Sequence, residues 1–145
     1  MKISININEN LDDTEISISC RKITPEIESL LASLRMLDSQ ITVVRDGETF
    51  IVDTADIYYI ESVDRKTFVY MKDEVYESGL KLYEMEERLC SGGFFRAGKS
   101  CLIQLRYIRS LKADIDRKIR VTLENGERLM VSRQYADELK RRLGI

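Results

Sequence analysis

Residues 41–52 read ITVVRDGETFIV, and residues 120–131 read RVTLENGERLMV. In each stretch, two runs rich in β-branched and other apolar residues flank a dipeptide, Asp46-Gly47 or Asn125-Gly126, that favours the tight turn of a β-hairpin. The sequence therefore predicts an antiparallel hairpin at both positions, and with them a mainly β unit that starts near residue 40.

The segment between the two hairpins also has the pattern of strands and short turns. Residues 57–61 and 67–71 are expected to pair across the polar loop 62–66, and residues 75–78 can pair next after a turn at residues 73–74. An antiparallel meander is the expected result.

Two short helices are predicted within this unit. The first has one apolar face and ends at the Ser-Gly-Gly of residues 91–93. Its apolar stripe consists of Leu82, Met85 and Leu89. The second covers residues 134–143 and is capped by Ser132, with basic residues at its C-terminal end where they complement the helix dipole. Its inward residues are Tyr135, Leu139 and Leu143.

The first 38 residues read as a smaller strand-strand-helix unit. Isoleucines alternate with polar residues over residues 3–7, and the alternation returns over residues 16–20. Thr24 is placed to cap a helix that begins at Pro25. Because a unit this short cannot enclose its own core, its apolar face must rest on the rest of the chain or on another subunit. We expect residues 1–38 to mediate self-association or contact with a regulator, and residues 40–145 to form the main domain.

Composition and charge exclude several classes of function. The chain has 145 residues, of which 43% are hydrophobic and 33% charged, and it contains no histidine, which rules out Ser-His-Asp and Cys-His catalytic systems and histidine zinc sites. The net charge of −2 is unevenly divided. Residues 94–145 hold 13 Lys+Arg and 6 Asp+Glu, a net +7, which leaves −9 for residues 1–93. The basic C-terminal part favours a polyanionic partner.

The cysteines and the N-terminus indicate a protein of the cytoplasm. Cys20, Cys90 and Cys101 form no C-x-x-C pair, so neither a disulfide framework nor a thiolate metal site is expected; Cys90 and Cys101 are expected to fill apolar space. No apolar run approaches the roughly 18 residues of a membrane span, and the N-terminus lacks a signal-peptide stretch. We expect no catalytic residue, metal or other cofactor.

Residues 93–100, GFFRAGKS, match the phosphate-loop pattern G-x-x-x-x-G-K-[ST]. That pattern binds nucleotides only when a buried strand precedes the loop and a helix begins at its end. Here a helix end precedes Gly93, and the β-like residues 101–105 follow Ser100. We therefore interpret the match as chance. A nucleotide-binding protein remains the alternative, and the structure of residues 93–100 distinguishes the two interpretations.

From about residue 42 to 144 the order of landmarks resembles the LytTR family of bacterial DNA-binding domains. The landmarks are DIYYIES (56–62), DRKTFVY (64–70), a short acidic helix, FFRAGKSCLIQLRYI (94–108), a hairpin, and LMVSRQYADELKRRL (129–143). The resemblance implies an elongated β-β-β fold with small helices, and hence an α+β, mainly β protein that acts as a stand-alone transcriptional regulator.

The resemblance also implies which residues contact DNA, because in this family loops enter successive major grooves. The corresponding residues here are Arg65, Lys66, Arg96, Lys99, Ser100, Arg133 and Gln134. Their chemistry agrees with this role: arginine can present two donors to guanine, and lysine and serine suit phosphates. Two positions depart from the family pattern, with Gly98 where a histidine is usual and Gln104 where an asparagine is common. Gly98 removes a possible base-reading side chain and loosens the loop, so the resemblance leaves the contacts of this loop and the preferred DNA sequence open.

The resemblance finally implies the partners. Double-stranded DNA with paired, similarly oriented half-sites is expected, bound by two copies of the chain, and a membrane protein that controls the regulator is a further expected partner. The alternative is a protein-interaction module that does not bind DNA.

Overall fold

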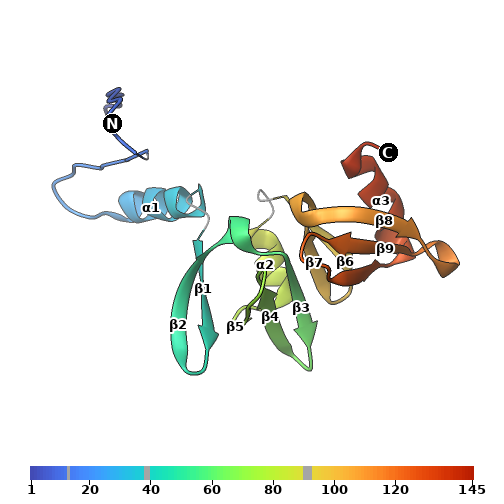
Figure 1. The fold of residues 1–145 in the computed structure, drawn as a ribbon. Helices are drawn as coiled ribbons and strands as arrows, with labels where there is room; N and C mark the ends of the chain where they lie inside the picture. Colours follow the sequence, from blue (N-terminus) through green and yellow to red (C-terminus); the bar gives the residue numbers. More distant parts are fainter. Residues whose placement is uncertain (13, 38–39, 90–92) are drawn as a thin grey trace.

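The computed structural model describes residues 1–12, 14–37, 40–89 and 93–145. Within these residues the chain forms two open antiparallel sheets and three α-helices, so the α+β, mainly β prediction is confirmed. Figure 1 shows an elongated arrangement with α1 near one end and the three-stranded sheet and α3 at the other.

The larger sheet has seven strands in the order β2-β1-β5-β4-β3-β7-β6. Its strands are β1 (Gln40–Arg45), β2 (Glu48–Asp53), β3 (Tyr59–Val63), β4 (Lys66–Tyr70), β5 (Val75–Ser78), β6 (Phe94–Gly98) and β7 (Cys101–Gln104). The smaller sheet has the order β10-β9-β8 and contains β8 (Ile108–Ala113), β9 (Ile119–Leu123) and β10 (Arg128–Val131). The 3₁₀ turns are η1 (Thr54–Asp56), η2 (Leu105–Tyr107) and η3 (Ile115–Arg117).

Both hairpins predicted from the turn dipeptides are present. Asp46 and Gly47 have positive φ angles of 52° and 76° between β1 and β2, as a two-residue hairpin turn that matches the strand twist requires. The turn between β9 and β10 is longer, and only Gly126 has a positive φ. The side-chain oxygen of Asn125 accepts a hydrogen bond from the Glu127 amide there.

Two hydrophobic cores stabilise the domain. The first lies between the seven-stranded sheet and α2 (Leu82–Arg88), and the predicted stripe of this helix is buried in it. The second lies between β6, β7, the three-stranded sheet and α3 (Arg133–Leu143). Leu139 is fully buried in this second core, while Tyr135 and Leu143 lie at its border and Ala136 joins it. Phe94 and Phe95 are buried, one in each core, so β6 connects the two.

The N-terminal unit differs from its prediction. The helix α1 (Pro25–Leu37) is present, and the Thr24 hydroxyl accepts a hydrogen bond from the Ile27 amide as a cap does. The two strands expected over residues 3–7 and 16–20 are not formed. A two-stranded hairpin is only marginally stable unless something covers its apolar face. Here that face is uncovered, since Ile3, one of its residues, is 82% exposed. The expected end of α2 at residues 91–92 and the environment of Cys90 lie outside the described residues.

Candidate nucleic-acid interface

The turn between β3 and β4 carries the first predicted contact. Its central residues, Asp64 and Arg65, have φ angles of 51° and 67°, a left-handed conformation that non-glycine residues rarely adopt. The two positive φ angles fit a tight hairpin turn whose twist agrees with that of the strands. Arg65 thereby lies exposed at the tip, and Lys66 follows as the first residue of β4, its Nζ 3.7 Å from Oε1 of Glu77.

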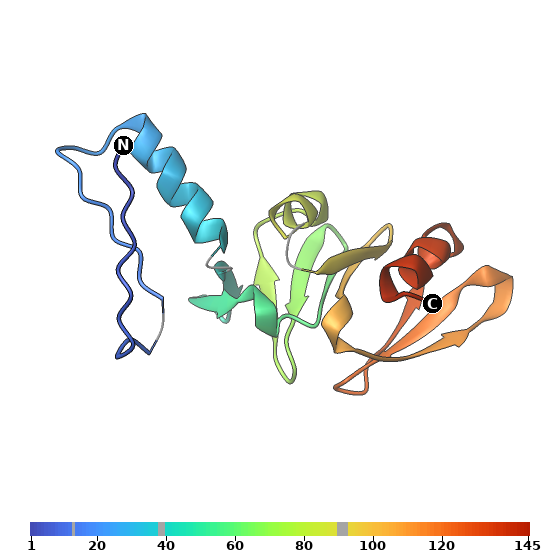
Figure 2. The same ribbon diagram turned by 90° about the horizontal axis from the view of Figure 1, so that it is seen from above.

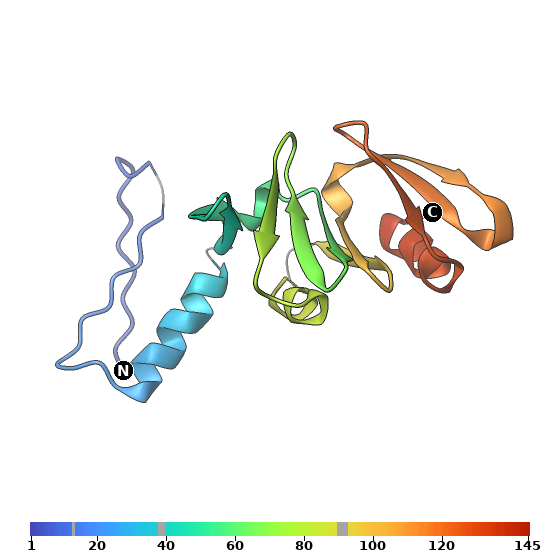
Figure 3. The same cartoon turned by 90° about the horizontal axis from the view of Figure 1, so that it is seen from below.

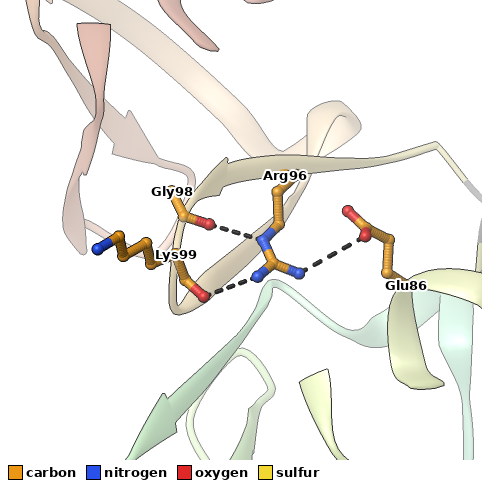
Figure 4. A network of polar contacts seen from close by, with 4 residues as sticks. All are labelled: Glu86, Arg96, Gly98 and Lys99. Atoms are coloured by element: carbon orange, nitrogen blue, oxygen red, sulfur yellow. Dashed lines mark hydrogen bonds and ion pairs between the residues drawn. The ribbon is translucent and has the colours of Figure 1, made fainter. Parts of the chain in front are cut away.

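The turn between β6 and β7 carries the second predicted contact. Lys99 and Ser100 are its two exposed residues. The Arg96 guanidinium lies behind them, where Nε donates to the Gly98 carbonyl at 2.6 Å and a terminal nitrogen donates to the Lys99 carbonyl at 2.7 Å. Its other terminal nitrogen pairs with Glu86 on α2 at 3.6 Å, as Figure 4 shows. In this arrangement Arg96 shapes the turn rather than pointing away from the protein.

The start of α3 carries the third predicted contact. The Ser132 amide donates to the Ala97 carbonyl at 2.9 Å, which fixes the beginning of the helix against β6. Ser132 holds the predicted N-cap position, but its side chain makes no capping hydrogen bond. Its backbone carbonyl accepts from the Tyr135 amide instead. Arg133 and Gln134 occupy the first turn and are exposed.

The fold brings these three segments next to one another, at the ends of β3 and β6. The Ser62 amide donates to the Ser100 carbonyl at 2.8 Å, and Glu61 pairs with Cys101, so the end of β3 lies beside the turn between β6 and β7. Ala97, which holds the start of α3, precedes that turn by two residues. The basic residues predicted from three distant stretches of sequence therefore form a group on three neighbouring segments. We call it the basic end, comprising Arg65, Lys66, Lys99, Ser100, Arg133 and Gln134.

The charges of the basic end are largely available to a ligand. Within the described part of the chain, Arg65, Lys99 and Arg133 take part in no ion pair, whereas Lys66 has an exposed partner. An exposed ion pair of this kind contributes little to stability, so Lys66 can leave Glu77 and pair with a phosphate instead. The arrangement can neutralise several phosphates at once and still present an arginine to base edges.

Gly98 lies next to Lys99 of the basic end, and the structure has space for a Cβ atom at this position. Its φ angle is not positive, and a Cβ placed on it would have no atom within 4 Å. The position where the family pattern has histidine therefore has neither a steric nor a conformational need for glycine.

Gln104 has a structural role that the sequence did not reveal. Its side chain is buried, and Nε2 lies 3.1, 3.2 and 2.5 Å from the carbonyl oxygens of Thr54, Ala55 and Ile57. The amide thus holds the turn that leads into β3. A polar residue inside the apolar run CLIQL is the signal that could have indicated this role, since a buried amide requires partners.

Two aromatic stacks support the strands behind the basic end. Tyr59 and Tyr70 stack at 4.1 Å, and Tyr58 stacks on Tyr107 at 3.9 Å, which confirms that Tyr58 and Tyr59 pack inside the protein. Burial raises the pKa of Tyr59, and nearby Glu127 raises it further. Cys101 packs against the second core, as expected, and burial raises the pKa of its thiol to about 12.

The segment GFFRAGKS does not form a phosphate loop. Residues 94–98 are strand β6, and Lys99 and Ser100 form a hairpin turn that leads into another strand rather than a helix. A phosphate loop needs backbone amides at a helix N-terminus, which this turn lacks. No group of acidic, histidine or cysteine side chains suited to a metal occurs among the described residues. None of the described helices is long and apolar enough to span a membrane.

Comparisons with known proteins agree with this geometry. Residues 47–144 match the family model of the LytTr DNA-binding domain. The chain is 27% identical over 147 residues to an uncharacterized HTH-type transcriptional regulator of Staphylococcus aureus, with 100% of this chain and 99% of that protein covered. It is 25% identical over 105 residues to the sensory transduction protein LytT of Enterococcus faecalis, with 72% of this chain and 43% of that protein covered.

A solved structure is similar over most of the chain. It is the LytTr DNA-binding domain of a Bacillus cereus protein, with a TM-score of 0.69 and 26% sequence identity, covering 74% of this chain and 98% of that domain. The helices α1, α2 and α3 are separated from one another by strands, so the described residues contain no helix-turn-helix pair.

Proposed function

The chain belongs to the LytTR family of DNA-binding domains, and from this premise we propose that it is a transcriptional regulator that binds a specific DNA sequence through its basic end. The observation that supports this proposal is the convergence of three cationic segments held together by the Ser62–Ser100 and Ser132–Ala97 backbone hydrogen bonds. One rigid scaffold can then place several turns on the same duplex.

We assign the contacts according to chemistry and exposure. Arg133 is exposed at the start of α3 and has the two-pronged donor that suits guanine in the major groove. Lys99 and Ser100 suit phosphates, as does Lys66 once it releases Glu77. Arg65 reaches from a turn tip, and Gln134 can offer its amide to a base edge or a phosphate. Arg96 acts indirectly, since its donors hold the carbonyls of the turn that presents Lys99.

Two finer proposals concern the assembly on DNA and its control. Two copies of the chain bind paired, similarly oriented half-sites, and a membrane protein partner controls them through the acidic N-terminal part; both rest on the family resemblance alone. The regulator needs no catalytic step in this proposal.

Selection of bound duplexes from a random pool, followed by sequencing, tests the proposal. We expect the intact chain to enrich one motif that occurs in two copies. The Arg133→Ala variant is expected to lose about 1–3 kcal/mol on the selected site and to relax preference at one base pair. Lys140→Ala, in the last turn of the same helix, is the control and should keep the preference.

Two results would contradict the proposal. The first is an intact chain that binds no duplex in preference to bulk DNA at moderate salt. This result would favour the alternative, a protein-interaction module that does not bind DNA. If Arg133→Ala weakens specific and random duplexes equally, Arg133 contacts phosphate and does not read bases.

A further inference from the structure

The three-stranded sheet has one covered face and one open face. Ile119, Val121 and Leu123 of β9 are buried in the second core, together with residues of α3. Because side chains alternate along a strand, Arg120 and Thr122 point to the opposite face. Figures 2 and 3 show α3 on one side of this sheet and no other described element on its opposite side. We call this opposite side the outer face.

The strand register places basic side chains from all three strands on the outer face. Arg120, on the central strand, has Lys112 of β8 on one side and Met130 of β10 on the other. Lys118 lies in extended backbone two residues before Arg120 and therefore faces the same way. The exposed basic residues of the outer face are Lys112, Lys118, Arg120 and Arg128.

The charges of the outer face are largely unbalanced. Arg120 pairs with Asp114 at 3.0 Å, but in the part of the chain that the structure describes the three other basic residues take part in no ion pair. Lys112 lies directly opposite Arg120, and like charges in such positions are destabilising. A lysine on an edge strand can protect that edge from wrong pairing, but Arg120 is on the central strand. An anionic partner would remove this repulsion.

A protein suits the outer face better than a nucleic acid does. Met130 is 43% exposed beside Arg120, and methionine and arginine are both enriched at protein–protein interfaces. The carboxylate of Asp114 lies against Arg120 and would repel a phosphate backbone. Residues opposite each other on neighbouring strands have Cβ atoms about 5 Å apart, which matches the spacing of acidic residues three or four positions apart on a helix.

The strand β10 leads from the outer face directly into the basic end. Met130 is followed by Val131 and then by Ser132, whose amide donates to the Ala97 carbonyl, and Arg133 begins α3. A protein bound to the outer face therefore lies next to one of the three segments that we assign to DNA.

We propose that the outer face binds an acidic surface of a second protein while the basic end holds DNA. Lys112, Arg120 and Arg128 pair with carboxylates of that partner, and Met130 packs against its apolar atoms. The presence of DNA in this inference rests on the proposed function, whereas the binding of an acidic partner does not.

A labelled poly-L-glutamate peptide tests the recognition of acidic groups by fluorescence anisotropy. The full chain carries Lys99→Ala and Arg133→Ala in this experiment, so that the basic end does not capture the peptide. Adding Lys112→Glu and Arg128→Glu, the outer-face pair, should weaken binding by about tenfold or more, because two attractions become repulsions.

The matched control is Lys2→Glu with Lys22→Glu. This control pair changes the net charge equally at exposed residues of the N-terminal unit, and should leave the affinity for the peptide nearly unchanged. None of these changes touches a buried residue, so the domain should stay folded, which near-ultraviolet circular dichroism checks. Equal peptide affinities of the outer-face pair and the control pair would overturn the proposal.

A second experiment separates the partner from DNA, in chains that keep Lys99 and Arg133. The outer-face pair should bind the selected duplex as well as the control pair does, but should change transcription from a promoter with that site several-fold. Weaker duplex binding by the outer-face pair alone would overturn the proposal, because this face would then contact DNA, and so would unaltered transcription. If the intact chain binds no duplex, the proposed function fails, and the peptide experiment alone decides whether the outer face binds acidic groups.

Discussion

Gln104 holds together, with one side chain, the turn that precedes β3 and the strand β7. Its amide nitrogen lies within hydrogen-bond distance of three carbonyl oxygens and is shielded from solvent. Carbonyl groups that lose such a donor inside a protein remain unsatisfied, which costs more than the hydrogen bond itself contributes.

Gln104→Leu should therefore destabilise the protein although it keeps the volume of the side chain nearly unchanged. We expect a loss of about 1–3 kcal/mol in the free energy of unfolding, measured by urea denaturation. Gln134→Leu, at the exposed start of α3, is the control and should change stability by less than about 0.5 kcal/mol. Equal effects of the two changes would show that the buried amide does not anchor the turn.

Cys101 should resist alkylation. Burial raises its pKa to about 12, so at pH 8 very little of the thiol is ionised, and the thiolate is the reactive form. Reactivity should therefore rise with pH up to about 12. Peptide mapping after iodoacetamide treatment should show Cys20, which is exposed, modified well before Cys101. Modification of both at similar rates in the folded protein would contradict this environment.

At the scale of elements, the turn between β3 and β4 combines backbone strain with a proposed contact to DNA. Asp64 and Arg65 both adopt positive φ angles, a conformation that costs roughly 1 kcal/mol or more for residues other than glycine. Glycine would relieve that strain and is the usual solution at such turns.

Arg65→Gly should thus raise stability and lower DNA affinity at the same time. The expected stability gain is about 0.5 kcal/mol, since relief of strain exceeds the added entropy of the unfolded chain. Arg117→Gly is a matched control, because Arg117 also has a positive φ, of 63°, in the turn between β8 and β9. Thermal unfolding should show similar gains for both, while fluorescence anisotropy with labelled duplex should show weaker binding only for Arg65→Gly. Unchanged binding would remove Arg65 from the interface.

The elements themselves were predictable wherever local sequence determines them. Asp46-Gly47 and Asn125-Gly126 indicated hairpins, and the stripe of α2 indicated a helix, because turn conformation and helical periodicity depend on neighbours in sequence. The alternation of residues 3–7 predicted a strand that is absent, since a strand also needs a partner, which local sequence does not supply.

At the scale of the whole molecule, the proposed contact with DNA is compatible with a net charge of −2, because residues 94–145 carry a net +7 and residues 1–93 a net −9. Neutralising phosphates with these residues releases counterions from the DNA, so affinity should fall steeply as salt increases.

Lys99→Ala should weaken binding to all duplexes alike and reduce the slope of log affinity against log salt concentration by about one. Lys112→Ala, on the exposed part of β8 outside the basic end, is the control and should leave the slope unchanged. A titration of affinity over a range of potassium chloride concentrations measures both. A sequence-dependent effect of Lys99→Ala would mean that this lysine touches bases.

The candidate contact residues come from the sequence, but their arrangement in the fold does not. Arg65, Lys99 and Arg133 belong to segments joined by long-range bonds such as that between Ser132 and Ala97. Such bonds depend on which strands become neighbours in the sheet, and no short stretch of sequence determines this. The inward direction of Arg96 was open for the same reason, because Glu86 reaches it from α2.

The open space around Gly98 has a consequence for how regulators of this kind diverge. A Cβ added at this position would meet no atom within 4 Å and would need no unusual backbone conformation. After a gene duplication, one copy could therefore acquire a new operator by a single substitution while its folding stayed intact, and the two copies would cease to compete for the same promoters.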